Sequence, residues 1–244
     1  LEATNNRSAG LLIGNYTIGT GLSHPVMSGL DLRNNGIGLY VYGLFASSSN
    51  PFVVGDLAAA SYQLDVSGSY YGLQIEGSTY VKVANLKNAL PVTAPAVQTT
   101  RAFDNPGAGV YAVTGNTNLS FIGLDLSGST AGGYGLFLGG TGHTLTNLVA
   151  SRRGTGVSAS NIGGLVINGL TATDCFNGLY LASTTTGTVP SLTNLTLTNN
   201  NTGLYLNVIT VPLVVGSTAS TTNVETGVVS NNGDPNLAGS YKGI

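Results

Sequence analysis

The sequence predicts an all-β fold in which one chain winds into a solenoid of stacked coils, a parallel β-helix. Three observations predict it. A short apolar stretch that begins with glycine recurs along the chain, a second alternating stretch precedes it at a constant distance, and 36 of the 244 residues are glycine. We expect about nine turns of roughly 22 residues each, within a single domain that spans residues 1–244.

The composition narrows the class of protein. Hydrophobic residues make up 42% of the chain and the mean hydropathy is +0.23, whereas only 7% of the residues are charged. An ordinary soluble domain has about 25% charged residues, so Ser, Thr, Asn and Gly must cover most of this surface. The net charge of −2 argues against nucleic acid as a partner. No apolar run approaches the roughly 18 residues of a membrane span.

The glycine-led stretch is the predicted second strand of each coil. Its apolar residues alternate with variable ones, and successive side chains of a strand point to opposite faces, so the Leu, Val and Ile positions should face the interior. The copies are Gly38-Leu39-Tyr40-Val41, Gly72-Leu73-Gln74-Ile75, Gly135-Leu136-Phe137-Leu138, Gly156-Val157-Ser158-Ala159, Gly178-Leu179-Tyr180-Leu181 and Gly203-Leu204-Tyr205-Leu206.

The predicted first strand of each coil is another short alternating stretch. Its copies are Leu30-Asp31-Leu32, Leu64-Asp65-Val66, Leu124-Asp125-Leu126, Leu148-Val149-Ala150, Leu170-Thr171-Ala172 and Leu195-Thr196-Leu197. The first leucine precedes the glycine of the second strand by the same offset in five copies, and the offset is longer only between Leu124 and Gly135. So constant an offset indicates a repeated geometry.

The links between the two strands predict sharp corners. They are polar, as in Arg33-Asn34-Asn35-Gly36, and Asn and Gly tolerate the left-handed backbone that a corner requires. The second-strand glycines recur at short and similar intervals, at Gly135, Gly156, Gly178, Gly203 and Gly227. The interval is too short for a βαβ unit of about 30 residues. It fits one turn of a solenoid, with equivalent strands stacked in parallel about 4.8 Å apart.

The stretch Leu195-Thr196-Leu197-Thr198-Asn199-Asn200-Asn201-Thr202-Gly203-Leu204-Tyr205-Leu206 resembles the right-handed parallel β-helix repeats of the pectin-lyase-like superfamily. The likeness covers roughly residues 1–240 and is strongest over 119–210. The resemblance implies a right-handed solenoid, which agrees with the handedness of parallel crossovers. It specifies activity poorly, because enzymes, adhesins, phage spikes and structural proteins share such coils.

Two segments interrupt the period. Residues 46–61 are predicted to be an insertion that hides a degenerate coil, and residues 89–108, which contain Pro91, Pro95 and Pro106, are predicted to be a loop thrown out of the coil. Long loops on a rigid scaffold often carry function. A plain solvated insertion is nevertheless the preferred interpretation of residues 89–108.

Both ends of the sequence continue the repeat. Gly10-Leu11-Leu12-Ile13 and Gly227-Val228-Val229-Ser230 resemble the second strand, and neither end shows an amphipathic capping helix. An open solenoid end presents unpaired strand edges and apolar core to another subunit. End-to-end self-association is therefore expected, unless caps were removed together with neighbouring domains. The absence of an initiator Met and of a leader pattern fits a processed chain or a fragment.

Three aspartates, Asp31, Asp65 and Asp125, occupy equivalent outward positions of the first strand, with Lys87 at the same place in Asn85-Leu86-Lys87-Asn88. Stacked carboxylates could bind Ca²⁺, but the lysine interrupts the ladder. Mutual neutralisation of charge is the preferred interpretation. No metal site and no cofactor are predicted, and the single Cys175 is expected to be a small buried or corner thiol.

An alternative enzyme site consists of Asp125, His143, Arg152 and Arg153. The resemblance implies that a hydrolase of this fold would need clustered aspartates with a Gly-His-Gly and an Arg-x-Lys segment, and Gly142-His143-Thr144 supplies only a fragment of this set. His143 is therefore interpreted as a turn residue. The two arginines could bind a uronate carboxylate in bidentate fashion, but a solvated corner is the simpler interpretation.

The third position of the second strand carries an aromatic side chain at Tyr40, Tyr111, Phe137, Tyr180 and Tyr205. Flanked by inward apolar residues, these rings should face outward as a ladder, interrupted at Gln74 and Ser158. They either stack on one another to stabilise the sheet, or offer a flat surface to a sugar ring or a neighbouring rod.

The sequence thus favours an exported, non-catalytic structural or adhesive β-helix that associates with itself, in an extracellular or cell-surface location. A polysaccharide lyase or glycoside hydrolase, or a glycan-binding β-helix like a phage spike, is the alternative. The expected partners are other copies of the chain and an extracellular glycan, with no nucleic acid and no membrane insertion.

Overall fold

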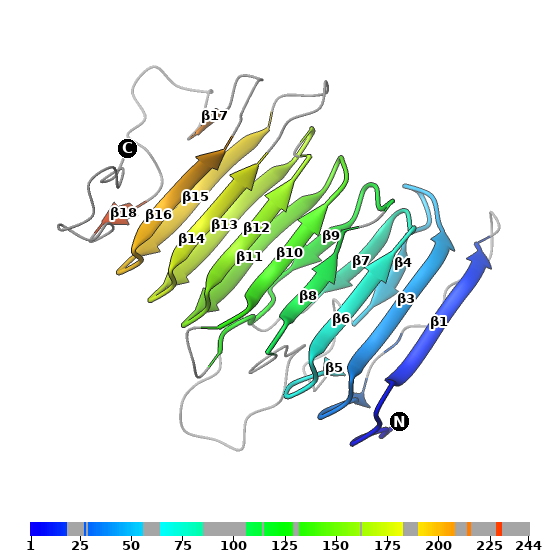
Figure 1. Ribbon diagram of the computed structural model, residues 1–244. Helices are drawn as coiled ribbons and strands as arrows, with labels where there is room; N and C mark the ends of the chain where they lie inside the picture. Colours follow the sequence, from blue (N-terminus) through cyan, green and yellow to red (C-terminus); the bar gives the residue numbers. More distant parts are fainter. Residues whose placement is uncertain are drawn as a thin grey trace.

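The chain folds into a parallel β-solenoid, described by a computed structural model in which two long sheets run side by side along the rod (Figure 1). The structure describes residues 1–18, 27, 29–55, 64–84, 106–113, 115–128, 132–161, 163–182, 190–207, 214–215 and 228–230. Within these residues every regular element is a strand, and all strand pairs are parallel. The predicted all-β solenoid is confirmed.

Sheet 1 is built from the predicted second strands. Its strands, in spatial order, are β1 (Ala9–Thr17), β3 (Ile37–Phe45), β6 (Tyr71–Glu76), β8 (Ala108–Ala112), β10 (Tyr134–Gly139), β12 (Thr155–Ser160), β14 (Asn177–Ala182) and β16 (Thr202–Asn207). Each strand pairs with the equivalent strand of the next coil, so spatial order follows sequence order.

Sheet 2 holds the strands that precede the corner of each coil. In spatial order they are β17 (Val214–Val215), β15 (Ser191–Thr198), β13 (Val166–Thr173), β11 (Thr144–Ser151), β9 (Ser120–Ile122), β7 (Val81–Ala84) and β4 (Phe52–Val54), with β18 (Val228–Ser230) also paired to β15. The two remaining strands, β2 (Leu30–Asp31) and β5 (Leu64–Asp65), pair with each other.

The leucine positions of sheet 1 stack in register and form the core. Leu136 pairs with Val157, Val157 with Leu179, and Leu179 with Leu204. All four side chains are buried. The apolar residues of sheet 2 face the same interior and join them in one continuous hydrophobic cluster. The prediction that leucines wind inward once per coil is confirmed.

Over the residues that the structure describes, the solenoid has about six turns rather than the predicted nine. The predicted period holds only in the C-terminal half of the chain. The glycines that lead the strands of sheet 1 are spaced more widely before Gly135 than after it, and they stand at Gly10, Gly38, Gly72, Gly109, Gly135, Gly156, Gly178 and Gly203. Because the N-terminal coils use more residues per turn, the chain forms fewer turns than predicted.

The corners form as the sequence predicts. The residue four places before the leading glycine adopts a left-handed backbone in several coils, with φ of 57° at Asn34, 53° at Arg152, 56° at Asp174 and 56° at Asn199. Asn is the favoured non-glycine residue in this conformation, because its short polar side chain can bond locally. In these coils the chain therefore turns sharply into sheet 1 at equivalent positions.

The leading glycines are required because the coils approach closely at that point. A Cβ atom added to Gly156 would lie 2.6 Å from the carbonyl oxygen of Gly178, and one added to Gly178 would lie 2.8 Å from the carbonyl oxygen of Gly203. Gly38 stands in the same relation to Gly72, at 2.6 Å. Each glycine thus leaves room for the backbone of the next coil.

Two local predictions need correction or limitation. Val228–Ser230 pairs with Thr196–Thr198 of sheet 2, so the stretch after Gly227 is not a second strand. Within the predicted insertion 46–61, β4 is a regular strand that pairs with β7, which agrees with a degenerate coil. Residues 56–63 and 85–105 lie outside the described residues, and β8 already begins at Ala108.

Candidate functional site

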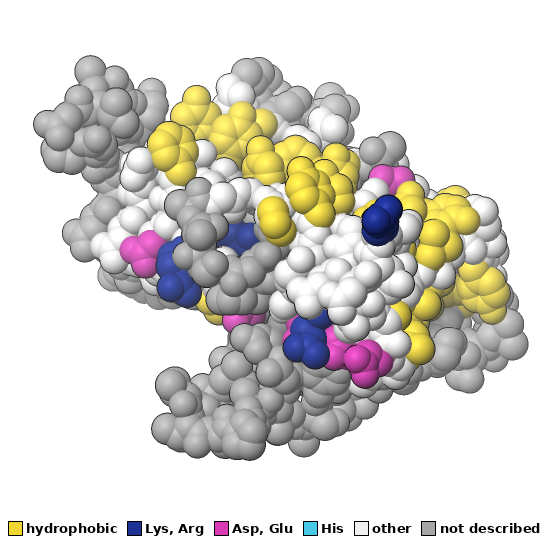
Figure 2. Space-filling model, turned by 60° about the horizontal axis from the view of Figure 1, so that its bottom comes forward, with side chains coloured by type: hydrophobic (Ala, Val, Ile, Leu, Met, Phe, Trp, Pro, Cys, Tyr) yellow, Lys and Arg dark blue, Asp and Glu magenta, His cyan; other side chains and the backbone are white. Residues whose placement is uncertain are grey.

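The predicted aromatic positions form one row along the outer face of sheet 1. In the strand register Tyr40 pairs with Gln74, Gln74 with Tyr111, Tyr111 with Phe137, Phe137 with Ser158, Ser158 with Tyr180, and Tyr180 with Tyr205. All five aromatic side chains are partly or fully exposed, whereas their inward neighbours are buried, except Leu206 in the last strand of the sheet. Figure 2 shows hydrophobic side chains gathered in a band over the strands of sheet 1, toward the top of that view.

The row consists of two stacked pairs and one separate ring. The rings of Tyr111 and Phe137 are parallel within 9° at a centroid distance of 5.6 Å, and those of Tyr180 and Tyr205 are parallel within 9° at 5.1 Å. Tyr40 instead contacts Tyr42 of its own strand, at 5.3 Å. Self-stacking therefore accounts for four of the five predicted rings.

Three further tyrosines extend the Tyr111 and Phe137 pair into a larger group. Tyr71 stacks on Tyr111 at 4.6 Å, Tyr70 meets Tyr71 edge to face at 4.8 Å, and Tyr134 lies tilted against Phe137 at 4.7 Å. We call Tyr70, Tyr71, Tyr111, Tyr134 and Phe137 the aromatic cluster. Its three additional members were not predicted. Tyr71 and Tyr134 both stand directly before a leading glycine, and this spacing could have revealed these two.

A carboxylate lies beside the row at its N-terminal end. The Tyr40 hydroxyl donates to one oxygen of Glu76 at 2.7 Å, and the Gln74 amide donates to the other at 2.7 Å. The hydrogen bond to Glu76, together with burial, raises the pKa of Tyr40 to about 12. Glu76 is the only charged residue in the eight strands of sheet 1, so the outer face is neutral over most of its length.

His143 is a buried structural residue of a corner. The residue is only 2% exposed. Its Nδ1 accepts a hydrogen bond from the Leu119 amide at 3.1 Å, and its Nε2 therefore donates to the Gly139 carbonyl at 3.2 Å. Burial lowers the pKa of His143 to about 4. Both ring nitrogens are occupied, in agreement with the interpretation of His143 as a turn residue.

The two arginines of the alternative enzyme site differ in environment. Arg152 is exposed, as a solvated corner requires, but Arg153 is only 2% exposed, which contradicts that expectation. The Arg153 guanidinium donates to the carbonyl oxygens of Leu126 at 2.7 Å and Ser127 at 2.9 Å in the preceding coil. A buried cation with backbone partners joins two coils.

His143 and Arg153 share a structural role that the sequence pattern did not reveal. A Cβ added to Gly140 would lie 2.9 Å from Nε2 of His143, and one added to Gly128 would lie 3.2 Å from Cζ of Arg153. Each of these long side chains therefore fills space at a corner where the nearby glycine has no side chain. In other coils a shorter side chain occupies the corner position of Arg153 and donates to a backbone carbonyl. Asn200, for example, donates to the Ala172 carbonyl at 2.9 Å.

Cys175 occupies the same corner position one coil after Arg153. Its thiol lies within hydrogen-bonding distance of the carbonyl oxygens of Ala150 and Thr173, at 3.7 and 3.4 Å. Burial raises the pKa of the Cys175 thiol. The expected small buried corner thiol is confirmed.

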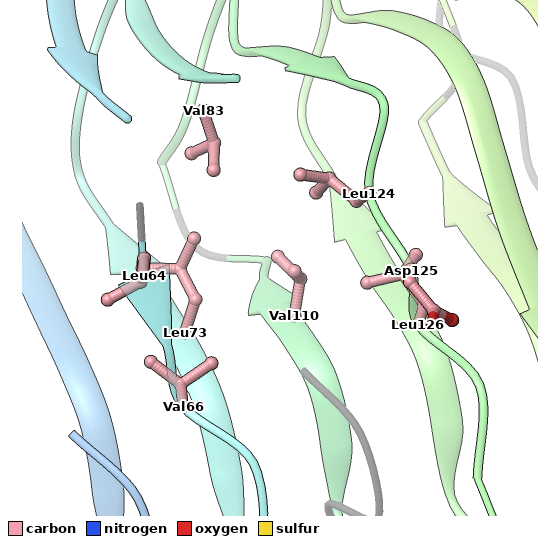
Figure 3. A pocket seen from close by; sticks show the side chains of 8 residues that line it. All are labelled: Leu64, Val66, Leu73, Val83, Val110, Leu124, Asp125 and Leu126. Atoms are coloured by element: carbon pink, nitrogen blue, oxygen red, sulfur yellow. The ribbon is translucent and has the colours of Figure 1, made fainter. Parts of the chain in front are cut away.

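The remaining predicted acid, Asp125, does not join the histidine or the arginines in a described contact. One of its carboxylate oxygens accepts a hydrogen bond from the Ser127 amide at 3.1 Å, a local turn. It lies at the rim of a small cavity whose other lining side chains are all Leu or Val, and its carboxylate is turned away from the cavity (Figure 3). The cavity is thus an apolar packing gap in the core.

One arginine lies beside two of the stacked aspartates. Asp31 pairs in register with Asp65, and Arg33 lies 2.6 Å from Asp31 and 4.0 Å from Asp65. The hydrogen bond from Arg33 lowers the pKa of Asp31. Lys87, the predicted charge partner, lies outside the described residues. Within the described part of the chain no group of three or more His, Cys, Asp or Glu side chains could hold a metal ion.

Comparison of the chain with models of protein families, with curated proteins and with solved structures finds no match. Among the described residues there is also no helix long and apolar enough to cross a membrane.

Proposed function

We propose that this chain is an exported, non-catalytic β-solenoid that serves as a structural or adhesive subunit and associates end to end into a filament or surface layer. We further propose that its coils are right-handed and related to those of the pectin-lyase-like superfamily. The low charge of the chain supports this proposal, because few like charges oppose close packing of subunits.

One observation carries the proposal: side chains that face the core in every inner coil are exposed at both ends of sheet 1. Leu206 in β16 is 43% exposed, whereas its register partner Leu181 is fully buried. At the opposite end Leu11 and Ile13 in β1 are partly exposed, whereas their partner residues in β3 are fully buried. Exposed core surface of this kind favours association.

The strand edges at the two ends support the same conclusion. Among the described residues, sheet 1 has β3 on only one side of β1 and β14 on only one side of β16. An unpaired edge is a template for another strand. Since all strands of the sheet are parallel and share one register, the edge of β16 in one copy offers to β1 of another copy the pairing that β14 offers to β16. The apolar core of one copy, which ends at Leu204 and Leu206, would then continue with Leu11 and Ile13 of the next copy.

The alternative of polysaccharide cleavage has less support. His143 and Arg153 are committed to backbone groups, and Asp125 is held in a local turn. We therefore assign these residues to the scaffold.

The proposal is tested by following the mass of the purified chain in solution and its appearance by electron microscopy as concentration rises. We expect filaments or a growing mass for the wild type. Ile13→Lys should abolish growth by placing a charge on the end surface, while its circular dichroism spectrum stays that of the wild type. Val149→Lys adds the same charge to the exposed side of sheet 2 and should assemble normally. A wild-type chain that stays monomeric at high concentration would contradict the proposal.

A further inference from the structure

The outer side of sheet 2 carries two rows of short side chains, most of them hydroxyls, where β11, β13 and β15 lie side by side (Figure 1). The rows follow the strand register, and their outward residues alternate with the fully buried Ala150, Ala172 and Leu197. All members of the rows are partly or fully exposed. The first row is Val149, Thr171 and Thr196, the second is Ser151, Thr173 and Thr198, and we call the two rows together the threonine face.

The strand geometry places the side chains of the threonine face on a regular net. Neighbouring coils are stacked about 4.8 Å apart, and alternate residues of one parallel strand are about 6.6 Å apart. The pairing continues across the three strands without a shift in register. Threonine is branched at Cβ and has few side-chain rotamers, so its hydroxyl and methyl groups repeat along each row at little further cost in entropy on binding.

The threonine hydroxyls of this face bond to solvent. Among the described residues, no hydrogen bond joins any of its four threonine hydroxyls to another protein group, and such a group must bond to water. The adjoining part of sheet 2 differs. It lies before a bend with left-handed backbone at Asn147, Gly169 and Asn194, and there the Thr193 hydroxyl donates to the Ile167 carbonyl at 3.3 Å.

The absence of charge determines which class of ligand fits the threonine face. None of its six residues is charged, and the whole chain has only 7% charged residues. A charged side chain would lose its hydration shell at a large cost when a solid surface came into contact with it. The face therefore suits an uncharged ligand that repeats in two dimensions and bonds to hydroxyl groups.

Crystalline water has the matching chemistry. Each water of ice donates and accepts hydrogen bonds, and a threonine hydroxyl can do both. The oxygen atoms on the prism plane of hexagonal ice repeat on a rectangular net whose two spacings are close to those of the threonine face. We propose that the threonine face binds ice through this plane, with the hydroxyls bonded to lattice waters and the methyl groups lying between rows of the lattice.

The test measures how the purified chain partitions between a slowly growing ice crystal and the remaining liquid. Serum albumin serves as the reference protein that ice excludes. A single ice crystal held just below its melting point in a solution of the chain gives a second readout. We expect the wild type to be enriched in the ice and to shape the crystal into hexagonal facets, because a bound prism plane stops growing.

Matched variants assign the binding to the threonine face. Val149 and Val166 are both valines of sheet 2 with similar exposure, 37% and 40%, but Val149 stands in the first row and Val166 lies before the bend. Val149→Lys should reduce enrichment in ice to that of the reference protein, because its long charged side chain holds the lattice away. Val166→Lys should leave enrichment unchanged. Thr173→Lys repeats the test in the second row, and thermal unfolding checks that every variant is folded.

Three results would overturn the inference. The first is a wild-type chain that ice excludes as it excludes the reference protein. The second is equal enrichment of the folded Val149→Lys and Val166→Lys variants. The third is a Val149→Lys variant whose only change is weaker self-association, which would assign the face to contacts between copies of the chain. Because Ile13→Lys leaves the threonine face intact, enrichment of that variant in ice separates the failure of this inference from the failure of end-to-end assembly.

Discussion

The N-terminal and C-terminal coils build the same sheets from different lengths of chain. Every turn between Gly10 and Gly109 takes more chain than any turn between Gly135 and Gly203. The register of sheet 1 nevertheless continues from β1 to β16 without a break. The stacked strands and the ladder of buried apolar side chains between them thus define the coil, and the links between strands take up the difference in length. Stability should depend on ladder position more than on the regularity of the period.

The largest expected effect separates an inner coil from an end coil. Leu179→Ala deletes a fully buried side chain with ladder partners on both sides and should lower the free energy of unfolding by about 2–5 kcal/mol. Leu11→Ala, at a partly exposed end, should cost about 1 kcal/mol. Urea unfolding at low protein concentration measures both. Equal losses would show that the end ladder is as well covered as the interior.

Acid should weaken the regular coils through His143. Its pKa is lower in the folded chain, about 4, than the ordinary 6.5, so the unfolded chain binds the proton first. The free energy of unfolding should therefore fall as pH decreases from about 6.5 to 4, by roughly 3 kcal/mol in total, and stay constant above this window. Asn116, which bonds backbone groups at the preceding corner of the irregular coils, does not titrate.

The measurement compares urea unfolding of the wild type and His143→Gln at pH 7 and pH 4.5. The variant should lose the dependence on pH in this window. Asp31, whose pKa is lowered by Arg33, loses its contribution only at more acidic pH. The same pH dependence in both proteins would assign it to other groups.

A smaller effect tests the close approach of the coils. Gly156→Ala places a methyl group against the Gly178 carbonyl and should cost about 1–3 kcal/mol. Gly132→Ala, in the same half of the molecule, has no atom within 4 Å of the added carbon and should be neutral within about 0.5 kcal/mol. Thermal melts of the two variants test this difference, and a tolerant Gly156 would mean that neighbouring coils can separate without cost.

The smallest effect concerns the outer face. In the regular coils Tyr180 and Tyr205 stack directly, and a double-mutant cycle to alanine should give a coupling energy of about 0.5–1.5 kcal/mol. In the irregular coils Tyr40 and Tyr111 are separated by Gln74, and the same cycle should give a value near zero. A coupling between Tyr40 and Tyr111 would indicate that the polar bridge through Gln74 and Glu76 transmits the interaction.

The part of the fold that rests on local pattern was predictable. Alternation placed Leu136, Leu179 and Leu204 in one ladder, and Asn at the corners indicated the left-handed backbone found at Asn34 and Asn199. The number of turns was not, because the short period of the C-terminal half does not extend to the longer N-terminal links. The pairing of Val228–Ser230 was not predictable either, because its glycine-led pattern fits sheet 1 although its strand pairs in sheet 2.

The sequence by itself determined the solenoid, the inward leucines and the outward aromatic row, because these follow from the alternation of side chains along each strand. Only the tertiary structure decided that Arg153 and His143 are buried, and that Tyr71 stacks on Tyr111 of the next coil. A side chain at a corner fills whatever space the neighbouring coil leaves, and that space depends on a glycine or a tyrosine in a distant part of the chain. Contacts of that kind are set by how the coils stack and not by any local pattern.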